Sequence, residues 1–154
     1  LYSMRIVIIL CLIAFQLEIN AKDLQSLRQT YLDSFKKEQV CDSVKIILEN
    51  KKELSNIENA YLGVFHMMKC RFTLNPISKI SLFSIGRDLL EQSIKNDPEN
   101  LEIRFLRYSI QKNIPKILLY SQHISTDEKF IFDKIALSKD KELNDYITST
   151  IKTF

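Results

Sequence analysis

Apolar side chains recur every three or four residues along most of this chain, the spacing that places them on one face of an α-helix. In the range 22–38 the stripe consists of Leu24, Leu27, Tyr31, Leu32 and Phe35. Equivalent stripes predict further helices over 41–54, 57–74, 76–95, 98–113, 125–137 and 139–152, with a short apolar turn at 117–120. The pattern therefore predicts an all-α domain of about 6–7 antiparallel helices.

Polar residues and prolines mark where the helices should begin and end. Ser55 can cap the helix that follows it, and Asn75-Pro76 should separate two helices, because proline suits a first turn and excludes the residue before it from a helix. The next helix should begin at Pro98 with Asp97 as its cap.

The apolar stripes also name the expected core positions. From 41–54 the inward side chains should be Val44, Ile47, Leu48 and Leu54. From 76–95 they should be Ile80, Phe83, Leu89, Leu90 and Ile94. Gly86 lies among them, and its missing side chain should let a neighbouring helix approach closely.

The first residues follow a different pattern, which predicts export. If Met4 is the initiator, residues 1–3 lie upstream of it; Arg5 and an apolar run from Ile6 to Phe15 follow, with Ala21 shortly after. These features predict a signal peptide over 1–21, a single helical domain over 22–154, and a periplasmic or secreted protein. Two alternatives are an uncleaved membrane anchor, which would place the protein on a membrane, and a lipoprotein modified at Cys11.

Composition excludes several classes of function. The only glycines are Gly63 and Gly86, whereas phosphate-binding loops and nucleophile elbows need several at fixed offsets. The formal net charge is +3, with acidic residues interleaved among the basic ones, which does not indicate a nucleic-acid partner. We find no catalytic constellation and predict no cofactor and no metal.

The segment NDPENLEIRFLR and the helix before it resemble a junction between tetratricopeptide repeats. In that family the second helix carries small, bulky and small residues followed by a proline, and here these positions hold Gly86, Leu90, Ser93 and Pro98. The first helix departs from the pattern, because strict register puts its Leu-Gly pair on residues 73–74 and its Tyr on Ile77. The resemblance covers about 40 residues and implies an irregular helical-repeat-like array.

Cysteines and histidines offer a few candidate sites. Cys41 and Cys70 remain after signal removal, and an even pair in an oxidising compartment can form a disulfide or stay as two buried thiols. His66 and Cys70 share a helical face, but a metal or catalytic site would need further groups such as His123 to converge with them.

A cationic and aromatic strip on the helix 98–113 is the candidate partner site. Arg104, Arg107, Tyr108 and Lys112 are spaced to lie near one another, and such a strip suits an acidic or C-terminal peptide. Alternatively, Asp97, Glu99 and Glu102 pair with the arginines. A second aromatic group, interpreted as core, as a partner groove or as a dimer contact, consists of Phe130, Phe132, Tyr146 and Phe154.

These observations favour an exported, non-catalytic helical protein that binds an unknown protein or peptide in the cell envelope. Two other classes stay open. One is a small envelope hydrolase or metal-dependent enzyme that uses His66, Cys70 or His123. The other is a carrier whose helices enclose an apolar ligand.

Overall fold

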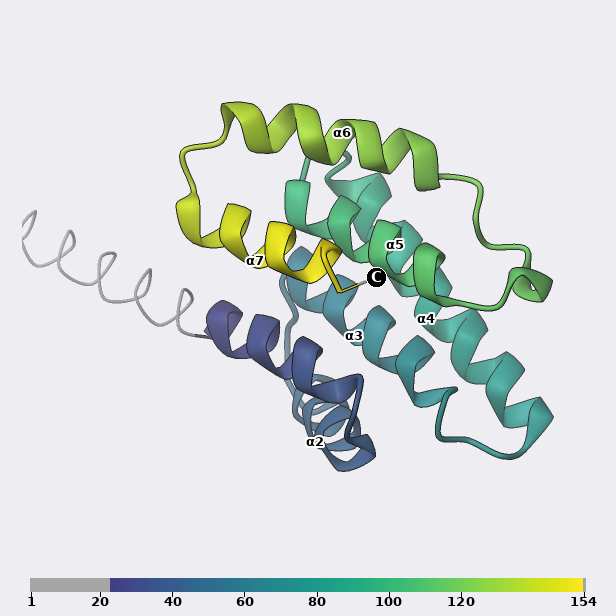
Figure 1. Ribbon diagram of the computed structural model, residues 1–154. Coiled ribbons are helices and arrows are strands. Elements are labelled where there is room, and N and C mark those ends of the chain that lie inside the picture. The colour runs from purple at the N-terminus through teal and green to yellow at the C-terminus, as the bar shows by residue number, and fades with distance from the viewer. Residues whose placement is uncertain (1–22, 154) are drawn as a thin grey trace, which may run out of the picture.

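The computed structural model describes residues 23–153, and all regular structure in this part of the chain is helical (Figure 1). Residues 23–34 form the first helical segment. The later elements are α2 (Glu38–Glu49), α3 (Asn56–Lys69), α4 (Pro76–Asn96), α5 (Leu101–Asn113), the 3₁₀ turn η1 (Lys116–Leu118), α6 (Ile124–Leu137) and α7 (Lys141–Ile151). The all-α prediction is confirmed, whereas the predicted signal peptide lies outside the described residues.

Helix α3 forms the centre of the domain. It packs against α2, α4 and α5, and its residues from Ala60 to Met68 are all buried. The surrounding elements add further fully buried side chains to the same core, among them Tyr31, Phe105, Leu106, Ile131 and Ile147. None of the helices in residues 23–153 is long and apolar enough to cross a bilayer.

The widest contact in the fold joins α3 and α4, which lie side by side (Figure 1). Gly63 of α3 faces Gly86 of α4, and a Cβ atom at Gly63 would lie 2.6 Å from the Gly86 carbonyl oxygen. A Cβ at Gly86 would lie 2.3 Å from the Gly63 carbonyl oxygen. The two backbones therefore touch where neither residue has a side chain, which confirms the role expected of Gly86.

The starts of α3 and α4 follow the polar signals, whereas the start of α5 does not. The Ser55 hydroxyl and the Glu58 carboxylate form a capping box at the start of α3, and the Asn75 side chain accepts from the Ile77 and Ser78 amides ahead of α4. Helix α5 begins at Leu101 rather than Pro98. Asn100 is its cap because its side-chain oxygen accepts from the Ile103 amide at 3.1 Å.

Two of the expected core positions are exposed. Ile47 of α2 is 60% exposed and Ile80 of α4 is 67% exposed. Helix α3 ends at Lys69 rather than at residue 74, so the 21-residue α4 extends beyond the 14-residue α3 at this end. The first turns of α4 therefore border an opening in the structure and not the core.

Candidate functional site

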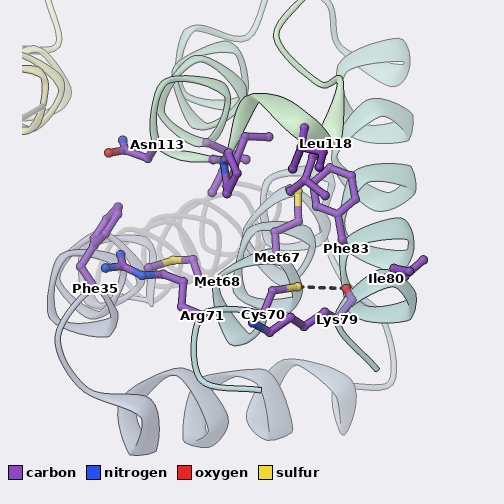
Figure 2. Close-up of a pocket in the computed structure, with 14 residues that line it drawn as sticks. Phe35, Met67, Met68, Cys70, Arg71, Lys79, Ile80, Phe83, Asn113 and Leu118 are labelled. Atoms are coloured by element: carbon purple, nitrogen blue, oxygen red, sulfur yellow. Dashed lines mark hydrogen bonds between the residues drawn. The ribbon is translucent and has the colours of Figure 1, made fainter. Parts of the chain in front are cut away.

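A pocket of about 460 Å³ lies beside the end of α3. Buried side chains from α3, α4 and α5 line its inner part, namely Met67, Met68, Phe83 and Ile110. Exposed apolar residues, among them Ile80, Ile117 and Leu118, form its outer part. Figure 2 shows that distant segments of the chain meet here, from Phe35 to Leu118.

The segment after α5 closes one side of the pocket. Its backbone turns at Pro115 and Leu119, and the Tyr120 side chain holds it against α4. Pro115 follows the end of α5 and precedes η1, and Leu119 takes a left-handed backbone conformation with φ of 49°. Tyr120 is buried, with its ring 5.8 Å from that of Phe83 in an edge-on contact. Its hydroxyl donates to the Glu91 carboxylate on α4. Tyr120 therefore ties the segment that carries η1 to α4.

Cys70 forms the opposite corner of the pocket. Its half-buried thiol donates to the Lys79 carbonyl oxygen at 3.3 Å, as the dashed line in Figure 2 shows. Burial raises the pKa of this thiol and outweighs the effect of the nearby Lys79 charge. The bond links the end of α3 to the start of α4, and the raised pKa does not suit a nucleophilic thiolate.

The charged side chains of the pocket are both basic. Arg71 and Lys79 line it, and none of its lining residues is acidic. The Arg71 guanidinium lies 5.8 Å from the centre of the Phe35 ring. Within residues 23–153 neither cation has a carboxylate within salt-bridge distance. The pocket is thus apolar inside and positively charged at its edge.

The strip predicted on α5 lies elsewhere and is engaged inside the fold. Arg104 and Arg107 both bind the carboxylate of Asp127 on α6, which has no exposed surface. Arg107 Nη1 also donates to Glu91 Oε2 at 2.9 Å. The arginines therefore find acids on α6 and α4 and not the expected Asp97, Glu99 and Glu102.

The other members of the strip also have partners within the chain. The Tyr108 hydroxyl donates to Glu128 Oε1 at 2.8 Å, and burial together with this carboxylate raises the pKa of Tyr108 to about 12. Lys112 Nζ lies 5.7 Å from the centre of the Tyr108 ring. A partner-binding role for Arg104, Arg107, Tyr108 and Lys112 stays a prediction, and a partner would have to compete with these contacts.

Sequence reasoning missed Asp127. The signal was present, because Asp127 lies four residues before Ile131 and so shares its buried helical face. Glu102 was expected to pair with the arginines of the strip, but it pairs with Arg28. Its carboxylate accepts hydrogen bonds from Arg28 Nε at 2.9 Å, from Arg28 Nη2 at 2.7 Å and from the Tyr61 hydroxyl at 2.6 Å. These bonds join the first helical segment to α3 and α5.

Cys41 and Cys70 are both free thiols, so the structure does not form the disulfide that the pair allowed. Cys41 is buried and donates to the Phe65 carbonyl oxygen at 3.3 Å, whereas Cys70 faces α4. Burial raises the pKa of Cys41 to about 11. Its thiol serves as a packed core group.

The histidines do not join Cys70 in a site. His66 Nε2 lies 3.2 Å from Glu49 on α2, and the backbone amide of His123 donates to Gln111 Oε1 at 3.1 Å. No group of three or more His, Cys, Asp or Glu side chains in residues 23–153 is placed to hold a metal.

The second aromatic group is dispersed. Tyr146 is buried, and the centre of its ring lies 5.4 Å from that of Phe105. The Arg104 guanidinium carbon lies 4.3 Å from the centre of the Phe130 ring. Phe132 is exposed, and Phe154 lies outside the described residues. Core packing accounts for Tyr146.

Comparison with known proteins finds no family model, curated protein or solved structure that matches this chain.

Proposed function

We propose that this protein is a non-catalytic binding protein that holds an apolar ligand in the pocket between α3, α4 and η1. The observation that carries the proposal is a pocket of about 460 Å³ with an apolar lining that reaches core side chains. This volume lies within the range of small-molecule sites, about 300–1,000 Å³. Export to the periplasm or the cell exterior is part of the proposal and rests on residues 1–21.

The test fills the pocket. Ile114 is half-buried in the lining, so Ile114→Trp places an indole in the space that a ligand would need. The matched control is Leu137→Trp, at an exposed position on α6 that does not line the pocket. Titration with the neutral apolar dye Nile red, whose fluorescence rises in apolar sites, gives the affinity. We expect at least tenfold weaker binding in Ile114→Trp alone.

A second readout uses the chain's own thiols. Cys70 lines the pocket and Cys41 does not, so a bound ligand should slow alkylation of Cys70 and leave Cys41 unchanged. Peptide mass spectrometry distinguishes the two sites. Equal dye binding in both tryptophan variants, or an unprotected Cys70, would contradict the proposal.

An interaction module for a protein or peptide is the second candidate, favoured by apolar residues around the pocket. Ile77 is 79% exposed and Ile117 is 86% exposed, more apolar surface than a ligand inside the pocket would cover. A photo-crosslinking residue at position 117 should then give a discrete product with one partner in the native host, while the same residue at position 137 gives none. Identical products at both positions would remove this candidate.

A further inference from the structure

We infer that the ligand is a monomeric long-chain carboxylate, with its tail among the apolar side chains of the pocket and its head group at Arg71 and Lys79. This inference rests on the proposed function and adds the chemistry of the head group. Its basis is the charge of the lining, in which two cations face an apolar space without any acid.

The treatment of arginine elsewhere in the fold makes this charge unusual. Of the arginines in residues 23–153, Arg71 alone lacks a carboxylate within salt-bridge distance. Arg28 pairs with Glu102 and Glu142, and Arg87 pairs with Asp88. Arg104 pairs with Asp127, and Arg107 pairs with Asp127 and Glu91. Arg28, Arg104 and Arg107 are buried or half-buried, and each is paired with an acid. Arg71 is exposed at the edge of the pocket, where an anion from outside can reach it.

Both cations belong to the lining of the pocket. Figure 2 shows Arg71, Cys70 and Lys79 along one edge of the pocket, with Phe83 and Leu118 across from them. The contact with Phe35 holds the Arg71 guanidinium at this edge, and the Cys70 thiol fixes the backbone of Lys79. A carboxylate here would gain charge-assisted hydrogen bonds while staying close to water, which limits its desolvation cost.

The same geometry discriminates against other amphiphiles. A cationic head group would place a third positive charge beside Arg71 and Lys79, which is repulsive. A neutral head group would leave both cations without a partner. The carboxylate should therefore be preferred over a cation with the same tail.

The test compares two probes of equal tail length, dodecanoate and dodecyltrimethylammonium. Each is titrated into the full chain below its micellar concentration, and isothermal titration calorimetry gives the affinity. We expect dodecanoate to bind at least tenfold more tightly. In the double variant Arg71→Glu with Lys79→Glu the order should reverse. The matched control, Lys139→Glu with Lys141→Glu, makes the same change in net charge at exposed positions away from the pocket and should keep the original order.

The outcomes separate this inference from the proposed function. If both probes bind the unmodified chain equally, or if both double variants lose dodecanoate equally, the carboxylate inference is wrong while the apolar pocket stands. If neither probe nor Nile red binds, the proposed function fails. Flotation with phosphatidylglycerol vesicles is the last arm, because binding to vesicles without binding of monomeric dodecanoate would overturn the inference in favour of a membrane surface.

Discussion

Buried charge is the dominant feature of this protein at the scale of single residues. Asp127 has no exposed surface and accepts from two arginines, one of which, Arg107, is itself buried. Removing one partner of such a set leaves the others desolvated without compensation, which costs more than the intact set contributes. Asp127 should therefore matter for stability far more than an exposed acid on the same helix.

Asp127→Asn should lower the free energy of unfolding by about 3–5 kcal/mol, because the amide cannot neutralise Arg104 and Arg107. Urea denaturation followed by circular dichroism measures the change. Asp133→Asn is the control on the same helix, since Asp133 is exposed and forms an exposed ion pair with Lys129. It should cost less than about 1 kcal/mol. Equal losses in the two variants would show that the buried network does not carry this energy.

The arginine strip shows where prediction from sequence stops at this scale. Helical spacing correctly placed Arg104 and Arg107 together, because positions three apart share a face. Nothing local to α5 indicates which acid they meet, since Asp127 and Glu91 lie on other helices. A face can be predicted from one helix, whereas a partner depends on which helices pack together.

At the scale of elements, the contact between α3 and α4 depends on two facing glycines. Sequence reasoning identified Gly86 as a point of close approach but placed the Leu-Gly position of its partner helix at residues 73–74. In the structure the residue that faces Gly86 is Gly63, and residues 73–74 lie in the connection before α4. Strict repeat spacing failed because the facing glycines lie 86 − 63 = 23 residues apart in the sequence, whereas the repeat register requires 86 − 74 = 12.

Gly63→Ala should destabilise the protein although alanine is the better helix former by about 1 kcal/mol. The added methyl group would lie 2.6 Å from the Gly86 carbonyl oxygen and 3.0 Å from the Leu90 amide nitrogen, both backbone atoms. Forcing the helices apart should cost about 1–3 kcal/mol, measured as a lower urea midpoint. Ser81→Ala, at an exposed position on α4, should be neutral or slightly stabilising. A Gly63→Ala variant as stable as Ser81→Ala would contradict the close contact.

The pocket could not be predicted because no single element contains it. Its apolar residues, such as Ile80 and Ile117, have the same sequence signature as core residues. They became a pocket because α4 extends past α3 and because Pro115 and Leu119 turn the chain after α5. These are relations between helix lengths and connections, which hydrophobic periodicity does not contain.

At the scale of the whole molecule, α5 separates a paired end from an open end. Its first half carries Glu102, Arg104 and Arg107, which join it by ion pairs to the first helical segment, α4 and α6. Its last turn carries Ile110 and Asn113, which line the pocket. Ion pairs within the described residues thus engage the charged side chains in the first half of α5. Near its last turn, Arg71 and Lys79 line the pocket without an acidic partner in residues 23–153, and we propose that a ligand binds there.

Stability of the whole molecule should also depend on pH through His66. Burial, followed by the charge of Lys45, lowers the pKa of His66 below its ordinary 6.5 and outweighs Glu49, which favours the charged form. The unfolded chain then binds a proton more readily than the folded one. Stability from this residue is present above pH 6.5 and is lost as the pH falls toward and through the folded pKa, with a slope of up to about 1.4 kcal/mol per pH unit.

Urea midpoints measured from pH 8 down to pH 5 test this sign. In His66→Gln the decrease below pH 6.5 should become shallower, because the titrating group is gone. In Glu49→Gln it should become steeper, because the loss of the carboxylate 3.2 Å from Nε2 removes the interaction that favours protonated His66 in the folded state. Unchanged slopes in both variants would mean that His66 does not link folding to pH, and opposite changes would mean that its folded pKa is raised.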